Sequence, residues 1–555
     1  MRYIFFAPMV AAMMSASVAN AQSDDAIAVH GSIQSDILVP QEDEKLGTGK
    51  YKDDVLTNTY ADISLSCKYL EAGARFEYNE HPLPGFEPKF KGWGVPHFYA
   101  KVKTNKGVDI TLGDFYDQFG SGLIFRTYEE RSLGIDNAIR GAHVDVSAIK
   151  GIQFKALGGV QRRYWDWDTD QFVAGSDLEI NIDQYSKAMQ DKNITWMVGG
   201  SYVYLNYNDD DKNTIMATGS NYRLNLPSSV HAFDVRSRLQ TGNYSFLAEY
   251  AWRSQDPSAD NGYIYRRGNA VLVSASYSAK GVSALLQAKR SENMAFRSNR
   301  YTTGTSAFLN NMPAFAYQHT YALAALYPYA TQAAPGEWAF QGEFGYSFKR
   351  HTPLGGKYGT KLKLNVSHIR GLDKDPVEPI HGITTSGTEG YTTSFFGMGK
   401  VYYQDINVQM EKKLSKSFKL NLMYMNQRYD KTVIEGEGGV IKSNIGVAEG
   451  KYQINKKFTL RGELQYLSTS QDQGDWAYGL LELSALPYLM FTVSDMWNTG
   501  ETDIHYYMAS VTATYKAHRL MVGYGKTRAG YNCSGGVCRF VPASKGLNVS
   551  YNYTF

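Results

Sequence analysis

Six charged residues gather between positions 126 and 140 of a glycine-rich stretch of the chain, residues 113–141, which reads GDFYDQFGSGLIFRTYEERSLGIDNAIRG. They carry both signs: Arg126, Glu129, Glu130, Arg131, Asp136 and Arg140. A buried charge is tolerated when an opposite charge pairs with it, and glycines permit the close turns that such pairing needs. We therefore expect residues 117–137 to fold into an enclosed space and narrow it with ion pairs. An ordinary solvated loop with weak surface ion pairs is the alternative.

The other patterns of reactive residues do not form a catalytic or metal-binding set. A hydrolase needs a nucleophile, a base and a group that orients the base, and the 11 histidines are scattered through the chain. Asp166, Asp168, Asp170 and Asp177 have the spacing of a calcium loop, but Gln171 stands where the turn glycine is required. We expect no enzyme activity, no cofactor and no metal.

The chain has three cysteines. Cys533 and Cys538 flank the sequence Ser-Gly-Gly-Val, so a short ring closed by a disulfide is expected in an oxidising compartment. Zinc is a weaker interpretation, because no further ligands lie nearby in the sequence. Cys67 falls on the apolar face of a strand pattern and is expected to be a buried or lipid-facing thiol.

The last nine residues form a strand pattern that ends on an aromatic residue. From Leu547 every odd position is apolar or aromatic, including Tyr551, Tyr553 and Phe555, and every even position is small and polar. Successive side chains of a strand point to opposite faces, so one face is apolar and the other polar. The pattern resembles the C-terminal signature of Gram-negative outer-membrane β-barrels. That resemblance implies integral insertion in the outer membrane and recognition of Tyr551, Tyr553 and Phe555 by the barrel assembly machinery.

Similar alternation recurs through most of the chain, for example at residues 70–78, 458–466 and 507–515. These segments approach the roughly 9 to 11 residues with which a tilted strand spans a bilayer. Short turns alternate with long polar connections, and both termini on the short-turn side require an even number of strands. The sequence predicts an all-β, transmembrane, antiparallel up-and-down barrel of about 24 strands (range about 20 to 26), with short periplasmic turns and long extracellular loops. Residues 174–186 are expected to be a strand, and residues 318–327 part of a long loop.

Residues 1–21 have the features of a cleaved secretory signal: Arg2, an apolar stretch and a final Ala-Asn-Ala. Residues 22–555 are then expected to form a single barrel domain. The mean hydropathy of −0.38 and the absence of a later apolar run argue against a helical membrane protein. At residues 113–141 and at Gly355-Gly356-Lys357-Tyr358-Gly359-Thr360 the chain is similar to an outer-membrane barrel family known only as a domain of unknown function. This similarity implies the compartment and the barrel but no substrate.

A barrel of about 24 strands has a wide lumen, which something must fill to preserve the membrane barrier. A large N-terminal plug is not expected, because the first strand pattern starts near Ala26. The favoured function is a channel or porin-like passive transporter for a small polar solute, with its lumen narrowed by the inward loop. The alternatives are a surface scaffold that docks partners on residues 291–336 and 371–398, and an embedded hydrolase. Outer-membrane lipid is an expected partner; the formal net charge of +3 makes nucleic acid an unexpected one.

Overall fold

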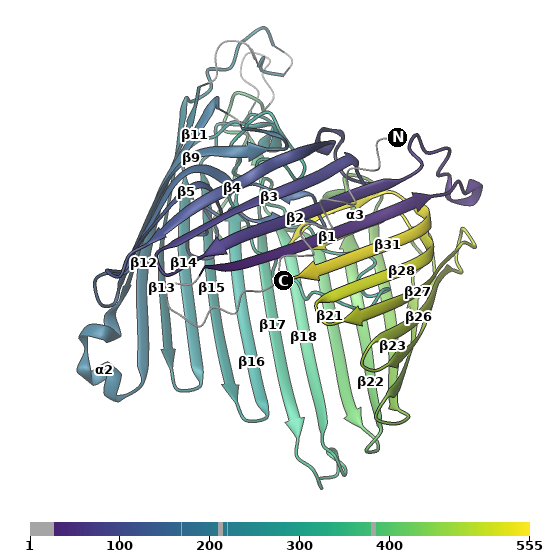
Figure 1. Ribbon diagram of the computed structural model, residues 1–555. Helices are drawn as coiled ribbons and strands as arrows, with labels where there is room; N and C mark the ends of the chain where they lie inside the picture. Colours follow the sequence, from purple (N-terminus) through teal and green to yellow (C-terminus); the bar gives the residue numbers. More distant parts are fainter. Residues whose placement is uncertain (1–26, 168, 209–214, 219, 379–384) are drawn as a thin grey trace.

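The computed structural model describes residues 27–167, 169–208, 215–218, 220–378 and 385–555 (Figure 1). The expected signal peptide, residues 1–21, lies outside the described residues. Most of the described chain belongs to one antiparallel sheet. Its long strands are β1 (Ala28–Pro40), β2 (Leu56–Ser66), β3 (Leu70–His81), β4 (Gly92–Lys103), β5 (Val108–Phe115), β8 (Ile139–Val146), β9 (Ile152–Arg163), β11 (Gln171–Asn181), β12 (Ile194–Tyr207), β13 (Ser229–Thr241), β14 (Tyr244–Arg253), β15 (Gly268–Ala279), β16 (Val282–Glu292), β17 (Glu337–Phe348), β18 (Thr360–Leu372), β21 (Met398–Lys413), β22 (Phe418–Asp430), β23 (Val440–Gln453), β24 (Phe458–Ser468), β25 (Trp476–Ala485), β26 (Leu489–Asn498), β27 (His505–Tyr515), β28 (His518–Thr527) and β31 (Ser544–Thr554).

The remaining elements are short and lie in the connections. They are the strands β6 (Glu129–Glu130), β7 (Ile135–Asp136), β10 (Asp166–Trp167), β19 (Asp375–Pro376), β20 (Tyr391–Thr392), β29 (Gly530–Ser534) and β30 (Val537–Val541), the helices α2 (Lys187–Asp191) and α3 (Lys431–Ile434), and the 3-10 turns η2 (Glu44–Leu46), η3 (Pro88–Phe90), η4 (Ile182–Tyr185) and η5 (Ala259–Asn261). No helix among the described residues is long and apolar enough to cross a membrane.

The sheet closes on itself because the first and last strands pair. The register of β1 and β31 runs antiparallel from Ser32 opposite Thr554 to Pro40 opposite Gly546. The sheet contains 25 strands, and without the two-residue β10, which pairs only with β9, the wall has 24. In Figure 1 the purple strand β1 and the yellow strand β31 therefore run side by side. The predicted closed barrel of about 24 antiparallel strands is confirmed.

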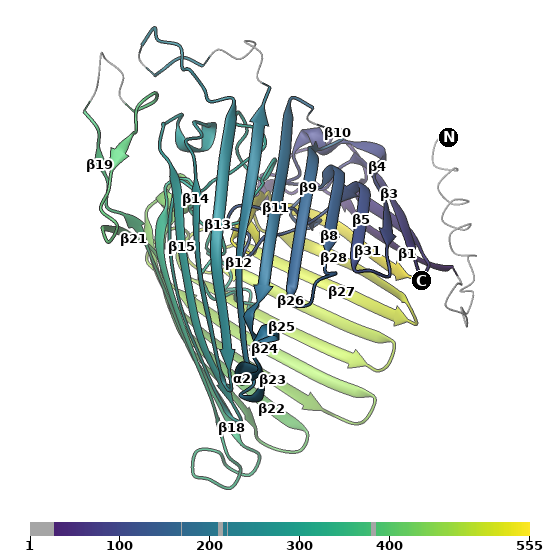
Figure 2. The same cartoon turned by 90° about the vertical axis from the view of Figure 1, so that its left-hand side faces the viewer.

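The connections differ between the two ends of the barrel. At one end the turns are short, such as residues 242–243, 280–281 and 516–517, and β1 begins and β31 ends there. At the other end the connections are long, and the longest spans residues 293–336. Figure 2 shows α2 at the short-turn end and the β19 region above the opposite rim. Residues 174–186 lie mostly in β11, and residues 318–327 contain no strand, both as predicted.

The two faces of a wall strand differ in burial, and β13 shows the difference. On β13, Phe233 and Val235 are 40% and 55% exposed, whereas Ala232, Asp234 and Arg236 on the opposite face are buried. A side-chain period of two residues produces this difference. A hollow barrel would leave its inner face open to water, so the burial of Asp234 and Arg236 indicates that the lumen is filled.

Candidate functional site

The connection between β5 and β8, residues 116–138, folds into the lumen. Its residues Phe119, Leu123, Ile124 and Phe125 have no exposed surface. The backbone N–H of Ser121 donates to both carboxylate oxygens of Glu249, at 3.2 and 3.1 Å. Glu249 lies on the inner face of β14, so the apolar tip of this connection reaches a strand that is six positions along the wall from β5. Apolar side chains are favoured there because the contact removes them from water.

A second connection, residues 293–336 between β16 and β17, also lies inside the barrel. Its backbone or side chains bind three inner-wall strands: Tyr317 N–H donates to Ser367 of β18 at 3.1 Å, and Leu323 N–H donates to Gln465 of β24 at 2.8 Å. His319 contacts Asp405 of β21 at 2.6 Å. The scaffold alternative, in which residues 291–336 form an outer docking loop, is therefore wrong for this segment. The physical reason is composition, since the buried apolar side chains of this segment would be costly on a solvated surface: Met294, Phe296, Leu309, Met312, Phe315 and Leu323.

The two inward connections bind each other. Arg126 N–H donates to the carbonyl of Leu309 at 2.8 Å, and Asn311 N–H donates to the carbonyl of Gly122 at 3.0 Å. The Asn137 amide donates to the carbonyl of Phe308 at 2.8 Å. We call residues 116–138 and 293–336 together the plug. It is one packed unit that belongs to the same chain as the wall.

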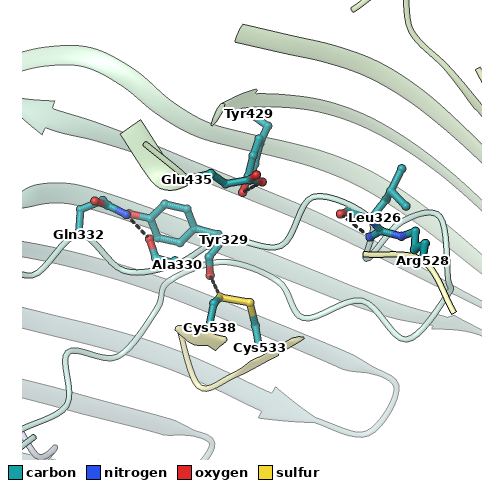
Figure 3. The surroundings of a disulfide bond; sticks show 9 residues. All are labelled: Leu326, Tyr329, Ala330, Gln332, Tyr429, Glu435, Arg528, Cys533 and Cys538. Atoms are coloured by element: carbon teal, nitrogen blue, oxygen red, sulfur yellow. Dashed lines mark hydrogen bonds between the residues drawn. A yellow bond between two sulfur atoms is a disulfide. The ribbon is translucent and has the colours of Figure 1, made fainter. Parts of the chain in front are cut away.

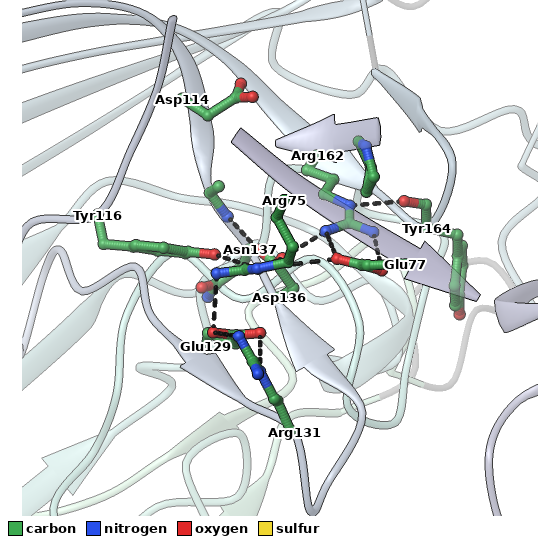
Figure 4. A network of polar contacts seen from close by, with 12 residues as sticks. Arg75, Glu77, Asp114, Tyr116, Glu129, Arg131, Asp136, Asn137, Arg162 and Tyr164 are labelled. Carbon is green, nitrogen blue, oxygen red and sulfur yellow. Dashed lines mark hydrogen bonds and ion pairs between the residues drawn. The ribbon is translucent and has the colours of Figure 1, made fainter. Parts of the chain in front are cut away.

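A network of ion pairs joins the plug to the wall (Figure 4). Arg75 of β3 is its centre: the guanidinium binds Asp62 of β2 at 2.7 Å, Glu129 at 3.0 Å and Asp136 at 3.1 Å. Arg131 of the plug binds the other oxygen of Asp62 at 2.9 Å and binds Glu129 at 2.7 Å. Asp62 thus bridges one arginine of the wall and one of the plug. Such charges are stable in a lumen because each has an opposite partner.

A second arginine of the wall completes the network. Arg162 of β9 binds both oxygens of Glu77 on β3, at 3.0 and 2.9 Å, and it also pairs with Asp136. The Tyr116 hydroxyl donates to the other oxygen of Asp136 at 2.9 Å. Arg162 and Glu77 are almost completely buried, so this pair depends on its geometry for stability.

The six charged residues singled out in the sequence do not form one cluster. Glu129, Arg131 and Asp136 belong to the network. Arg126 lies over the ring of Tyr128, at 4.5 Å from its centroid, and Glu130 accepts from Ser132 and Ser534. Arg140 lies on β8, where it pairs with Asp114 at 2.8 Å and stacks on Trp167.

Sequence reasoning missed the members of the network that lie in the wall. These are Asp62, Arg75, Glu77 and Arg162. The alternation of side chains does place Arg75 and Glu77 on the polar face of their strand, which points to the lumen. The alternation did not indicate which distant charges they meet.

Two cavities lie along the inner wall, one on each side of the network. The inner cavity, toward the short turns, has a volume of about 550 Å³ and is lined by Ser32, Asp62, Arg75 and other residues. The outer cavity, toward the long loops, has a volume of about 290 Å³, and Gln34, Tyr60 and Arg131 are among its lining residues.

The β1–β2 register shows that these cavities are neighbours. Ser32 pairs with Asp62 and Gln34 pairs with Tyr60, at successive inward positions of the two strands. The contact Arg131–Asp62–Arg75 lies where the two cavities meet. We call these three residues the gate.

The two cysteines lie in a hairpin above the plug. Cys533 of β29 and Cys538 of β30 are joined by a disulfide (Figure 3). The third cysteine, Cys67, is a free thiol. Thr331 N–H of the plug donates to the carbonyl of Gly536, in the turn of this hairpin, at 2.9 Å. Arg528, just before β29, donates to the carbonyl of Leu326 at 3.0 Å. The hairpin therefore holds residues 326–331 of the plug from the long-loop end.

The three aromatic residues of the last strand lie on the face opposite the lumen. Ser550 and Asn552 alternate with them, and Ser550 Oγ donates to Asp36 of β1 at 2.7 Å inside the barrel. Tyr553 and Phe555 stack with ring centroids 5.5 Å apart. Their role as a signal for barrel assembly stays a prediction. No group of three or more His, Cys, Asp or Glu residues able to hold a metal ion occurs in the part of the chain that the structure describes.

Comparison with known proteins gives one family and a set of distant structures. The protein family described as "Family of unknown function (DUF6029)" matches residues 1–555. No curated protein matches the sequence. Solved structures similar to the chain include the siderophore receptor PirA from Pseudomonas aeruginosa (TM-score 0.39, 12% identity, covering 95% of this chain and 80% of that chain). They also include a point mutant of the ferric enterobactin receptor PfeA from the same organism (TM-score 0.44, 9% identity, 95% and 80% covered) and OccAB3 from Acinetobacter baumannii (TM-score 0.34, 9% identity, 95% and 99% covered). Similarities at these scores assign no function to this chain.

Proposed function

Since the chain belongs to the family of unknown function DUF6029, whose description supplies no activity, we propose a function from the barrel interior: a porin-like channel that conducts small polar solutes passively. The observation that supports it is the pair of cavities separated by the gate. A solute would enter the outer cavity, pass Arg131, Asp62 and Arg75, and leave through the inner cavity. Fixed charges at a narrow point screen solutes by size and charge.

The site of action that we propose is the outer membrane, with the barrel as an integral protein. The support is the outer face of the wall, where apolar and aromatic side chains are exposed on strand after strand: Phe233, Leu286, Phe344, Leu464, Leu481 and Val493 are examples. An apolar outer face of this kind is stable in contact with lipid. A closed barrel can be placed in lipid because all its backbone hydrogen-bonding groups pair between strands. We further propose that the terminal strand ending at Phe555 is read by the assembly machinery.

The solutes that we propose are small and polar. The inner cavity is lined by charged or hydrogen-bonding side chains at most positions, among them His30, Asp62, Arg75, His97 and Lys101. Both signs are present, so a strong preference for anions or cations is not expected. The outer cavity has a volume of about 290 Å³, which limits the solute to a small molecule and excludes an oligosaccharide.

The decisive experiment is conductance of the purified, refolded protein in a planar bilayer. Wild-type protein should insert in discrete conductance steps, and Arg131→Gln should enlarge each step because the bridge to Asp62 is lost. Arg350→Gln, in an exposed turn at the short-turn end, is the matched control and should leave the step size unchanged. A correctly folded barrel that never conducts, or an Arg131→Gln step equal to that of wild type, would overturn the proposal.

A further inference from the structure

The outer cavity contains an arginine that forms no ion pair with an acid among the described residues. Arg539 of β30 lies over the ring of Phe86, 3.9 Å from its centroid, and donates from Nη2 to the carbonyl of Ser132 at 2.9 Å. Its Nε and Nη1 have no hydrogen-bond partner among the described residues. Burial lowers the pKa of this guanidinium to about 10, so it is still protonated at neutral pH. Arg539 differs in this respect from the arginines of the gate, which bind two or more carboxylates each.

The same cavity contains an acid that pairs only with neutral donors. Asp36 of β1 accepts from the Gln34 amide at 3.0 Å and from Ser550 Oγ at 2.7 Å. In the described part of the chain neither oxygen has an ion pair with a lysine or arginine. A carboxylate has about four acceptor positions, so Asp36 retains capacity for a charged donor.

Neutral donors lie beside the unpaired charges. Asn58 and Tyr60 of β2 line this cavity, and the Asn58 Nδ2 and the Tyr60 hydroxyl have no partner among the described residues. Buried polar groups without partners are uncommon in proteins and call for an explanation such as an absent ligand. Donors beside Arg539 would suit a ligand oxygen that carries negative charge.

We propose that the outer cavity is a binding site for a zwitterionic solute, namely a free amino acid or a short peptide. The solute carboxylate would bind the guanidinium of Arg539, with Asn58 and Tyr60 as further donors, and the solute ammonium group would bind Asp36. A cavity of about 290 Å³ admits a dipeptide but not a folded chain. This binding site rests on the proposed channel function in one respect only, namely that solutes enter through the outer cavity.

The position of the cavity gives such binding a consequence for transport. Arg131 lines the cavity and also forms part of the gate, where it binds Asp62 at 2.9 Å and Glu129 at 2.7 Å. The carboxylate of a solute that moves inward from Arg539 competes with Asp62 for Arg131. The site thereby places the solute next to the ion pair that it must displace.

Equilibrium binding to detergent-solubilised protein tests the site without requiring conduction. Calorimetric titration with glycylglycine should show saturable binding, and N-acetyl-glycylglycinamide, which has neither charge, should not bind. Arg539→Gln and Asp36→Asn should each weaken glycylglycine binding about tenfold or more, as expected for loss of one hydrogen-bonded charge. Arg350→Gln is the control. Equal binding of the neutral analogue, or unchanged affinity in both variants, would refute the site.

Single-charge analogues separate a true site from a folding defect. Arg539→Gln should still bind glycinamide, whose ammonium group uses Asp36, and Asp36→Asn should still bind N-acetylglycine, whose carboxylate uses Arg539. A misfolded variant would lose both. Conductance without glycylglycine binding refutes this inference and leaves the channel intact. Binding without conductance refutes the channel and leaves the site intact.

Discussion

Gly31 and Phe555 exchange both backbone hydrogen bonds of one antiparallel pair: Gly31 N–H donates to Phe555 at 3.0 Å and Phe555 N–H donates to Gly31 at 2.9 Å. The ring of Phe555 lies over Gly31, where a Cβ would be 2.3 Å from Cζ of the ring. The final residue of the chain therefore completes the seam between β1 and β31. A side chain at position 31 can be accommodated only if the ring of Phe555 moves.

Substitution of Gly31 should weaken the seam. Gly31→Val forces the Phe555 ring away and should destabilise the barrel by about 1 to 3 kcal/mol, the usual effect of overpacking. Denaturant unfolding in detergent measures this change. Gly446→Val is the matched control, because a Cβ at Gly446 meets nothing within 4 Å. Equal effects of the two substitutions would contradict the role of the Phe555 ring.

Truncation of a buried leucine should loosen the plug. Leu123 has no exposed surface, so Leu123→Ala should cost about 2 to 5 kcal/mol through lost burial and the cavity left behind. Thermal unfolding followed by circular dichroism gives the value. Leu354→Ala, at a position 63% exposed, should change the stability by less than about 0.5 kcal/mol. A silent Leu123→Ala would mean that residues 116–138 do not pack in the lumen.

Breaking the buried ion pair of the wall should be costly. Arg162→Met removes both hydrogen bonds to Glu77 and leaves it with the 3.7 Å contact to Arg75 alone, and removal of one partner of a buried pair costs about 3 to 5 kcal/mol. Addition of Glu77→Met should recover much of the loss, which a double-mutant cycle measures. The control is the exposed pair Lys361–Glu411, where Lys361→Met should have an effect below about 1 kcal/mol. Additive effects at Arg162 and Glu77 would be inconsistent with a coupled pair.

Loss of the disulfide should free the hairpin above the plug. The double variant Cys533→Ser, Cys538→Ser opens a small ring, for which chain entropy suggests a loss of about 2 kcal/mol. Protease cleavage between residues 528 and 543 should become faster, and single-channel current should become noisier because residues 326–331 lose their support. Cys67→Ser should change neither measurement. A double variant indistinguishable from wild type would separate the hairpin from the plug.

The strands of the wall can be predicted from the sequence because the pattern that identifies them is local. Alternation of side chains and short turns located most strands, and β11 was recognised although Ala174–Ser186 gave a weak pattern. The absence of a strand at residues 318–327 was also predicted, from the requirement that short turns share one end. Both conclusions depend on neighbours in the sequence and on the parity of the strand count.

The contacts inside the lumen are harder to predict because they join residues far apart in the sequence. Nothing near Arg131 in the sequence indicates that Asp62, 69 positions away, is its partner. The scaffold alternative places residues 291–336 on the surface because of their length, although the apolar residues of this segment favour burial. Charge and hydropathy show that a segment requires a partner, but the closure of the sheet decides which partner it meets.

The plug is attached to the wall at both ends. Phe115 and Ile139, which flank residues 116–138, pair directly with each other on β5 and β8, and β16 and β17 likewise flank residues 293–336. Neither segment can leave the barrel as a separate body. Opening of the proposed channel would therefore be a unimolecular rearrangement within a closed wall. Its rate would be independent of protein concentration, and the plug would remain attached and able to close the lumen again.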